Sequence, residues 1–148
     1  MIQTILILCI GNICRSPIAE ALFIERFKQN GLTGIAVSSA GLAALVDRPA
    51  DPIGQALMLE KGLDISEHRA RQISPDILFG SDLILTMSTD QQKQVELNYP
   101  GTCGRVHRLG KWGGYDVPDP FQRPKPVFEQ ALAMIEQGVD EWYRKLWK

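Results

Sequence analysis

The segment from residue 4 to residue 25 reads as a strand, a short loop and a helix in direct succession. The apolar run 4–8 is typical of a buried strand, and the next eight residues, CIGNICRS, include the Gly and Asn that suit a tight loop. Pro17 suits the first turn of a helix, and the following apolar positions keep helical spacing. This order constrains the chain toward an α/β fold.

The loop at residues 9–16 also carries the chemistry of an anion site. In a loop between a strand and a helix, backbone N–H groups point inward, and the positive end of the helix dipole points to the same place. Such a site would stabilise the Cys9 thiolate, which makes it a nucleophile near neutral pH, and Arg15 would bind two phosphoryl oxygens. The plainer alternative is a buried Cys9 that ends a core strand, with Arg15 solvated at a helix start.

Composition places the chain among ordinary globular proteins. Its 148 residues, 45% hydrophobic and 22% charged, fit one domain, which we assign to residues 1–148. A net charge of −1 provides no basic field, so we expect no binding to nucleic acid. The apolar start is too short to span a bilayer and lacks a preceding basic segment, which predicts a strand, no membrane insertion and a cytoplasmic location.

Three cysteines indicate a reducing compartment. Cys9, Cys14 and Cys103 form neither a disulfide framework nor a zinc-binding pattern, and we expect no metal and no cofactor. Cys14 either traps an oxidised Cys9 as a disulfide or packs as a small apolar residue under the loop. Cys103 has no partner in the sequence, and we predict that it lies in the core.

The rest of the chain alternates apolar runs with amphipathic segments. We predict strands at 35–40, at 82–87 and around Val106. Helices are predicted by caps and apolar spacing: from Asp51-Pro52 to Gly62, from Ser88 to just before Tyr99, and over 128–146. This order predicts a mostly parallel sheet with helices on both faces, and ligands bind such sheets beyond the carboxyl ends of the strands.

A second candidate element lies in the Pro- and Gly-rich region 99–126. A phosphate ester cleaved by a thiolate needs a proton on its leaving oxygen, and a carboxyl group above the loop can supply it. Asp119 is our candidate, because a proline on each side restricts its backbone and Phe121 would form an aromatic wall. Asp116 is the second choice. A plain Asp-Pro turn with a surface carboxylate explains the segment about equally well.

Four segments resemble the low-molecular-weight protein tyrosine phosphatases. They are the octet at 9–16, SSAG at 38–41, the stretch 68–72 and DPF at 119–121, and they occur in that family's order over nearly the whole chain. The resemblance implies a flavodoxin-like fold, with a four-stranded parallel sheet and the phosphate-binding loop after its first strand. It also implies hydrolysis of phosphotyrosine without metal, through a phosphocysteine intermediate.

The resemblance assigns catalytic roles to three residues. Cys9 would be the nucleophile, Arg15 the clamp on the phosphate and Asp119 the general acid. The residues between the first two would line the phosphate site: Ile10, Gly11, Asn12, Ile13 and Cys14.

The same resemblance gives roles to three further residues. Ser16 would belong to the phosphate-binding residues and hydrogen-bond the Cys9 sulfur, while Asn12, with Ser39 and His68 behind it, would hold the loop in shape. Sequence physics alone identifies neither Ser39 nor His68. It does support Asn12, because Asn accepts the positive φ that a tight anion-binding loop requires.

The segments 40–46 and 50–52 resemble the bacterial family members found with capsule and exopolysaccharide systems. For those members the implied partner is an autophosphorylating tyrosine kinase of the polysaccharide export machinery, and we expect a monomeric enzyme. Leu42 and Phe121 would form the pocket walls. A deep pocket between them suits a flat phenyl ring, so we expect an aryl phosphate as substrate.

Two other functions stay open on the sequence. Thiol-dependent arsenate reductases share the Cys-x5-Arg-Ser loop, but that family has two further, closely spaced cysteines downstream, where this chain has only Cys103. A non-catalytic module that senses phosphate or a phosphorylated partner would use the same loop without chemistry. A reactive Cys9 would separate an enzyme from such a module.

Overall fold

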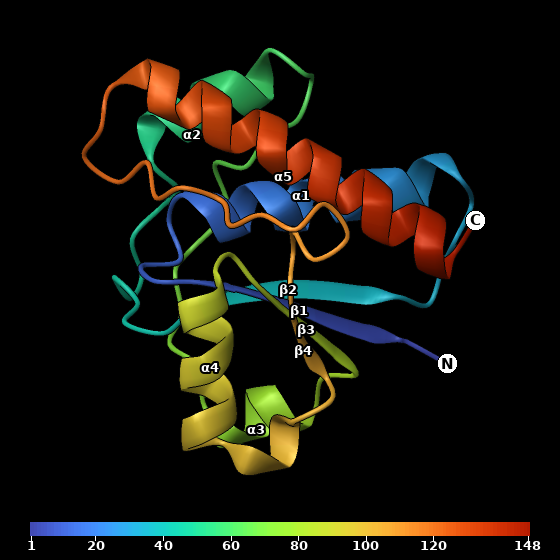
Figure 1. The fold of residues 1–148 in the computed structure, drawn as a ribbon. Coiled ribbons are helices and arrows are strands. Elements are labelled where there is room, and N and C mark those ends of the chain that lie inside the picture. Colours follow the sequence, from blue (N-terminus) through green and yellow to red (C-terminus); the bar gives the residue numbers. More distant parts are fainter.

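The computed structural model describes residues 1–148 and contains one parallel four-stranded sheet between two layers of helices (Figure 1). The strands are β1 (Thr4–Cys9), β2 (Ala36–Gly41), β3 (Leu83–Thr86) and β4 (Val106–Arg108), in the order β2-β1-β3-β4. The helices are α1 (Arg15–Gln29), α2 (Pro52–Leu59), α3 (Pro75–Phe79), α4 (Thr89–Asn98), the 3-10 turn η1 (Pro100–Thr102) and α5 (Lys125–Leu146). The predicted flavodoxin-like architecture is confirmed.

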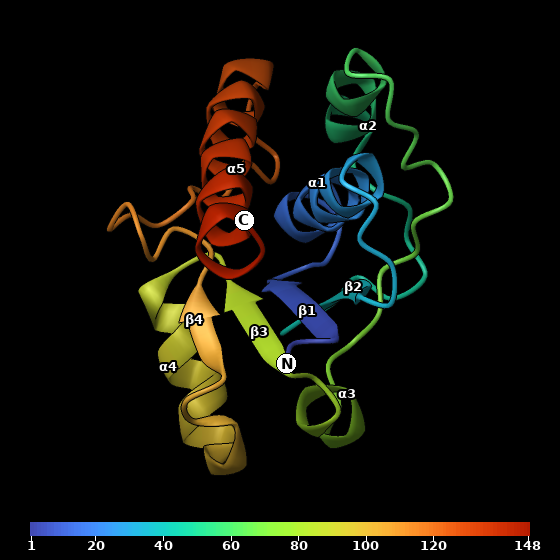
Figure 2. The ribbon, with the colours of Figure 1, turned by 90° about the vertical axis from the view of Figure 1, so that its right-hand side faces the viewer.

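Strand β1 lies at the centre of the sheet and is packed from both sides. Helices α1, α2 and α5 cover one face, and α3 and α4 cover the other (Figures 1 and 2). Successive side chains of β1 alternate between the faces, so Ile5 and Ile7 join the larger core, while Leu6 and Leu8 join the smaller one. This double packing fixes the position of Cys9, the last residue of β1.

Side-chain caps define the starts of α2 and α4, as predicted. The Asp51 carboxylate accepts the Ile53 N–H at 2.9 Å at the start of α2, and the Ser88 hydroxyl accepts the Gln91 N–H at 3.2 Å at the start of α4. The Gln91 side chain reaches back to the N–H of Met87, one residue further than in a capping box. Helix α2 ends at Leu59, before the predicted end.

Two features differ from the sequence predictions. The short helix α3 was not predicted, because five residues are too few to show a helical period, although Ser74 caps it and Pro75 begins it. The prediction of a core Cys103 is wrong, because this residue follows η1 in the turn before β4 and is exposed. None of the helices is both long and apolar enough to cross a membrane.

Candidate active site

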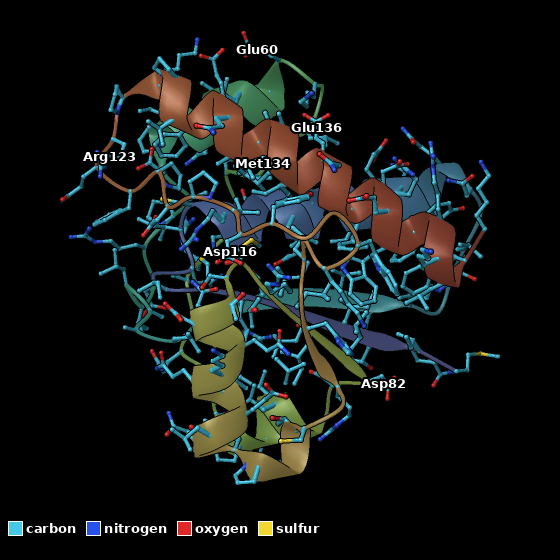
Figure 3. The ribbon with its side chains drawn as sticks, in the orientation of Figure 1. Glu60, Asp82, Asp116, Arg123, Met134 and Glu136 are labelled. Carbon is cyan, nitrogen blue, oxygen red and sulfur yellow. The ribbon has the colours of Figure 1, made fainter.

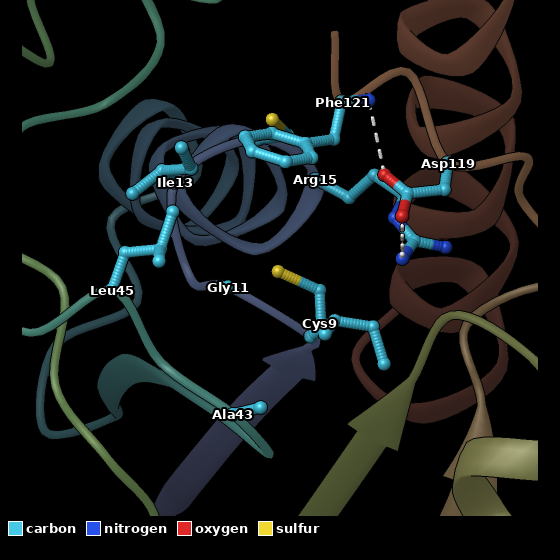
Figure 4. Close-up of a pocket in the computed structure, with 10 residues that line it drawn as sticks. Cys9, Gly11, Ile13, Arg15, Ala43, Leu45, Asp119 and Phe121 are labelled. Carbon is cyan, nitrogen blue, oxygen red and sulfur yellow. Dashed lines mark hydrogen bonds and ion pairs between the residues drawn. The ribbon is translucent and has the colours of Figure 1, made fainter.

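A pocket lies at the carboxyl edge of the sheet, between two loops. The first is the loop at residues 9–16, which leads from β1 into α1, and the second is the loop at 109–124, which leads from β4 to α5. Figure 4 shows the Cys9 sulfur pointing into this pocket. Ten residues line it: Cys9, Ile10, Gly11, Ile13, Cys14, Arg15, Ala43, Leu45, Asp119 and Phe121.

Asn12 lies fully buried beneath the pocket and holds the 9–16 loop in shape. Its φ is 59°, in the left-handed region that the sequence analysis predicted. Its amide nitrogen donates to the Ser16 and Ser39 hydroxyls at 2.8 and 3.0 Å, and its amide oxygen accepts the Arg71 N–H at 2.9 Å. The His68 Nε2 lies 2.6 Å from the Asn12 carbonyl oxygen. The structure therefore brings the predicted supporting residues together around Asn12.

The same hydrogen bonds aim a donor at the nucleophile candidate. The Asn12 amide oxygen accepts the Arg71 N–H, so the amide nitrogen faces Ser16 and donates to its hydroxyl oxygen. The hydrogen of the Ser16 hydroxyl is therefore free to bond another acceptor. The nearest acceptor is the Cys9 sulfur, at 2.9 Å. A hydroxyl that donates to sulfur stabilises the thiolate over the thiol.

Glu20 ends this chain of hydrogen bonds and was missed in the sequence analysis. The Ser39 hydroxyl donates to the Glu20 carboxylate at 2.5 Å, which leaves the Ser39 oxygen free to accept from Asn12. Glu20 lies one helical turn after Ser16 on α1, and that spacing is the one signal that the sequence offers.

Arg15 is buried and lines the pocket, and the protein uses only part of its N–H groups. Its Nη1 donates to the Val117 carbonyl at 2.9 Å, and its Nη2 lies 3.7 Å from an Asp119 oxygen. Its Nε is buried and has no partner in the protein. A buried donor without a partner is rare in folded proteins, and Arg15 also lines the pocket, where its guanidinium can donate to an oxyanion.

The two candidate acids occupy different places. Asp119 lines the pocket, and its side chain is 50% exposed, with one oxygen accepting the Phe121 N–H at 3.1 Å (Figure 4). Asp116 does not line the pocket, and one of its oxygens accepts from Thr89 and Arg108 instead. Only Asp119 can reach a group bound above Cys9.

Cys14 shares the pocket lining with Cys9 but has a different environment. Burial raises the pKa of the Cys14 thiol to about 12, and the nearby Asp51 carboxylate adds to the shift. Cys14 therefore stays protonated near neutral pH. Both residues are free cysteines in this structure.

The prediction of Leu42 as a pocket wall is wrong. Ala40 faces the smaller core, and Leu42, in the turn that directly follows β2, packs against the same core. Leu45 takes the expected place: its N–H donates to the Gly11 carbonyl at 3.0 Å, and its side chain lines the pocket with Ala43. Phe121 forms the other wall, as predicted.

The chain is similar to known tyrosine phosphatases along its full length. The family model described as low molecular weight phosphotyrosine protein phosphatase matches residues 4–148. A probable low molecular weight protein-tyrosine-phosphatase, EpsP of Ralstonia solanacearum, is 44% identical over 99% of this chain and 97% of its own length. Wzb of Escherichia coli K12 is 35% identical over 99% of this chain and 97% of its own length.

Solved structures agree with these relatives. The tyrosine phosphatase amsI of Erwinia amylovora matches with a TM-score of 0.91 and 32% identity, over 100% of this chain and 95% of its own. Vibrio vulnificus Wzb in complex with benzylphosphonate matches with a TM-score of 0.91 and 30% identity, over 99% of this chain and 100% of its own. Together with the family match, these relatives show that the chain belongs to the low molecular weight protein tyrosine phosphatases.

Proposed function

We propose that the enzyme hydrolyses phosphotyrosine through a phosphocysteine on Cys9, with Arg15 as phosphate clamp and Asp119 as general acid. The observation that carries the proposal is the Cys9 sulfur in the pocket, with the Ser16 hydroxyl 2.9 Å away. Arg15 and the loop residues Ile10, Gly11, Ile13 and Cys14 line the same space. This arrangement would hold a phosphoryl group with its phosphorus against the sulfur.

The first step forms a bond between sulfur and phosphorus. The Cys9 thiolate attacks in line while the bond between phosphorus and the tyrosine oxygen breaks. Arg15 and the loop amides stabilise the charge on the remaining phosphoryl oxygens. Asp119 donates its proton to the leaving phenolate.

The second step returns the enzyme to its starting state. Asp119, now a carboxylate, takes a proton from a water molecule as that water attacks phosphorus. The sulfur–phosphorus bond breaks, phosphate leaves and Cys9 is again a thiolate. One carboxyl group thus serves first as acid and then as base, so the rate should fall on both sides of a pH optimum.

An aryl phosphate fits the walls of the pocket best. Ile13, Leu45 and Phe121 offer apolar contacts around the entry to Cys9. A phenyl ring gains from such contacts, whereas a charged or sugar phosphate would lose hydration there. The benzylphosphonate in the Vibrio vulnificus relative has the same combination of phenyl ring and tetrahedral phosphorus.

The protein substrate that we propose is an autophosphorylating tyrosine kinase of capsule or exopolysaccharide export, on which the enzyme acts as a cytoplasmic monomer. Support comes from the similarity to EpsP and Wzb and from the segment 40–46. A purified, tyrosine-phosphorylated kinase of this class should lose its phosphotyrosine when mixed with the enzyme. The Cys9→Ser variant should instead retain the phosphorylated kinase on a column, and a kinase that keeps its phosphate would point to another substrate.

The position of Cys103 argues against an arsenate reductase. Cys9 ends β1 at the carboxyl edge of the sheet, while Cys103 precedes β4 at the opposite edge. Since all strands are parallel, the length of a strand separates the two residues. A thiol relay from Cys9 to Cys103 therefore has no direct path.

The test is the hydrolysis of p-nitrophenyl phosphate with a chelator present. The wild type should turn over, and Cys9→Ser should reduce kcat by about 10⁴-fold or more, because a hydroxyl without a base is a poor nucleophile. A correctly folded, reduced wild type without turnover would favour the phosphate-sensing module instead.

A further inference from the structure

Asp116 ties the 109–124 loop to two other elements of the carboxyl edge. One of its carboxylate oxygens accepts the Thr89 N–H at 3.1 Å, the Thr89 hydroxyl at 3.2 Å and the Arg108 Nη1 at 3.0 Å. Thr89 is the first residue of α4, and Arg108 is the last residue of β4. Figure 3 shows Asp116 beside the first turn of α4. A carboxylate at a helix N-terminus is also favoured by the helix dipole.

Beyond Val117 the loop has no other hydrogen bond to the body of the protein. Val117 donates to the Met87 carbonyl at 2.9 Å and accepts from Arg15 at 2.9 Å. From residue 118 to residue 124, every hydrogen bond stays within the loop or joins it to the start of α5. The single link from Asp119 to the body is its ion pair with Arg15, at 3.7 Å. Besides the packing of the buried Pro120, the position of Asp119 therefore depends on the attachment at residues 116 and 117.

The chain between the attachment and Asp119 is stiff. Pro118 and Pro120 flank Asp119, and each proline ring fixes its own φ near −65° and restricts the residue before it. A displacement at Asp116 is therefore passed on to Asp119, because few backbone dihedrals are free to absorb it. A shift of about 1 Å in a catalytic group can cost on the order of 10²-fold in rate.

We propose that Asp116 is a positioning residue, which sets the place of the Asp119 carboxyl group through Thr89 and Arg108. The inference rests on the proposed role of Asp119 as general acid. Asp116 touches neither substrate nor Cys9 and acts through Asp119 alone. Its ion pair with Arg108 lies at the surface and contributes little to folding, so its removal should affect proton transfer more than the fold.

The first experiment compares two substrates in the Asp116→Ala variant. Phenyl phosphate has a poor leaving group that needs the proton, whereas p-nitrophenyl phosphate needs it less. We expect kcat/KM to fall about 10-fold for phenyl phosphate and less than about threefold for p-nitrophenyl phosphate. Equal losses for both substrates would overturn the proposal.

A matched control comes from the opposite edge of the sheet. Asp82 accepts the N–H groups of Gln3 and Thr4 at 2.8 and 3.0 Å, so it ties two segments together as Asp116 does, but far from the pocket (Figure 3). The Asp82→Ala variant should keep the wild-type ratio of the two rates. A changed ratio of the two rates in Asp82→Ala would show that the loss of any aspartate that ties two segments together alters the dependence on the leaving group, and it would overturn the proposal.

A double-mutant cycle decides whether Asp116 acts through Asp119. In the Asp119→Ala background, Asp116→Ala should cause little further loss with phenyl phosphate, because the acid that it positions is gone. The same loss in both backgrounds would overturn the proposal. Arg108→Gln provides a second variant should Asp116→Ala fold poorly, and it should show the same dependence on the leaving group.

Failure of the underlying function would look different from failure of this inference. A wild type without Cys9-dependent turnover contradicts the proposed function. An Asp119→Ala variant that slows both substrates equally contradicts the role of Asp119, and with it the role of Asp116. An Asp119→Ala variant that behaves as expected beside an Asp116→Ala variant with wild-type kinetics contradicts the inference alone.

Discussion

The two loops that meet over Cys9 are held in different ways. In the 9–16 loop, Asn12 and Ser16 are fully buried, and Asn12 has a partner for each polar atom of its side chain. In the 109–124 loop, Asp119 is half exposed, and its segment is attached to the body mainly at residues 116 and 117. The proposed phosphate site is thus held by a buried hydrogen-bond network, while the proposed acid is exposed and follows an attachment made by Asp116 at the surface and Val117 in the core.

This difference fits the two tasks. Donors that stabilise charge in a transition state must be in place before the reaction, and a buried, fully satisfied network provides that rigidity. The acid must instead lie above a substrate that enters and a product that leaves, so it belongs on an open loop. Changes in the 9–16 loop should therefore affect both folding and rate, while changes of the exposed Asp116 and Asp119 side chains should affect rate more than folding.

Removal of the acid should give the largest effect in this comparison. Asp119→Ala should lower kcat/KM for phenyl phosphate by roughly 10²- to 10³-fold, with a smaller loss for p-nitrophenyl phosphate. Its urea midpoint should stay at the wild-type value, because the side chain is 50% exposed. Rates across a series of substituted phenyl phosphates measure the dependence on the leaving group, and a uniform loss would count against Asp119 as the acid.

Removal of the Asn12 side chain should damage both folding and rate. Asn12→Gly keeps a backbone that accepts a φ of 59° but removes the donor to the Ser16 and Ser39 hydroxyl oxygens and the acceptor of the Arg71 N–H. Buried groups left unpaired should lower the free energy of unfolding by about 2–4 kcal/mol in total. Urea denaturation measures the loss.

Gln122 offers the matched control in the 109–124 loop. It has a φ of 58°, close to that of Asn12, but it is exposed. Gln122→Gly relieves the left-handed strain and breaks no side-chain hydrogen bond, so stability should change by less than about 1 kcal/mol. Similar losses in the two variants would mean that the greater backbone freedom of glycine, and not the loss of the buried network, destabilises the Asn12→Gly variant.

A smaller loss is expected where β2 touches the 9–16 loop. A Cβ atom on Gly41 would lie 2.5 Å from the Ile10 carbonyl oxygen, which is backbone and cannot move aside. Gly41→Ala should therefore lower the free energy of unfolding by about 1–3 kcal/mol and also reduce kcat.

Gly54→Ala is the control for that substitution. Gly54 lies within α2, and its added Cβ would meet side-chain carbons of Ile18 and Phe128 at 3.5 and 4.0 Å, which is ordinary contact. The substitution should raise stability by about 0.5–1 kcal/mol. A destabilised Gly54→Ala variant would show that an added methyl group is not tolerated even where it makes only ordinary contacts, so the loss in Gly41→Ala could not be assigned to the Ile10 carbonyl.

The parts of the site that lie close together in sequence could be predicted. The octet at 9–16 combines a strand end, a turn and a helix start, so its loop and the positive φ of Asn12 follow from local rules. The order of strands and helices likewise predicted the parallel sheet. Asp119 was preferred over Asp116 as the candidate acid for its neighbours, and it lines the pocket in the structure.

Contacts between distant segments were found only where the family resemblance supplied them, as for Ser39 and His68, and others were missed. Leu45, and not Leu42, forms the pocket wall. Which side a residue faces after β2 depends on where the strand ends and the turn begins, and a loop has no sequence period from which this could be predicted. Arg71 meets Asn12 across 59 positions. Such contacts follow from the folded arrangement and leave no pattern in a single sequence.

The smallest expected effect concerns His107, at the base of the 109–124 loop. Burial of the ring lowers the pKa of His107 below its ordinary value of 6.5, and Lys111, whose Nζ lies 3.4 Å from Nδ1, adds to the shift. Between the lowered value and 6.5 the unfolded chain binds more protons than the folded one, so stability rises with pH there and is lost as the pH falls below about 6.5.

The His107→Gln variant isolates this contribution from the other titrating groups. Between pH 7.5 and pH 5.5 the wild type should lose more thermal stability than the variant, by no more than about 2 °C in Tm. Thermal unfolding of both proteins in matched buffers measures the difference. Because His107 directly precedes Arg108, the partner of Asp116, the comparison also tests whether the attachment of the 109–124 loop loosens in acid. If so, kcat/KM for phenyl phosphate should fall more steeply below pH 6.5 in the wild type than in the variant.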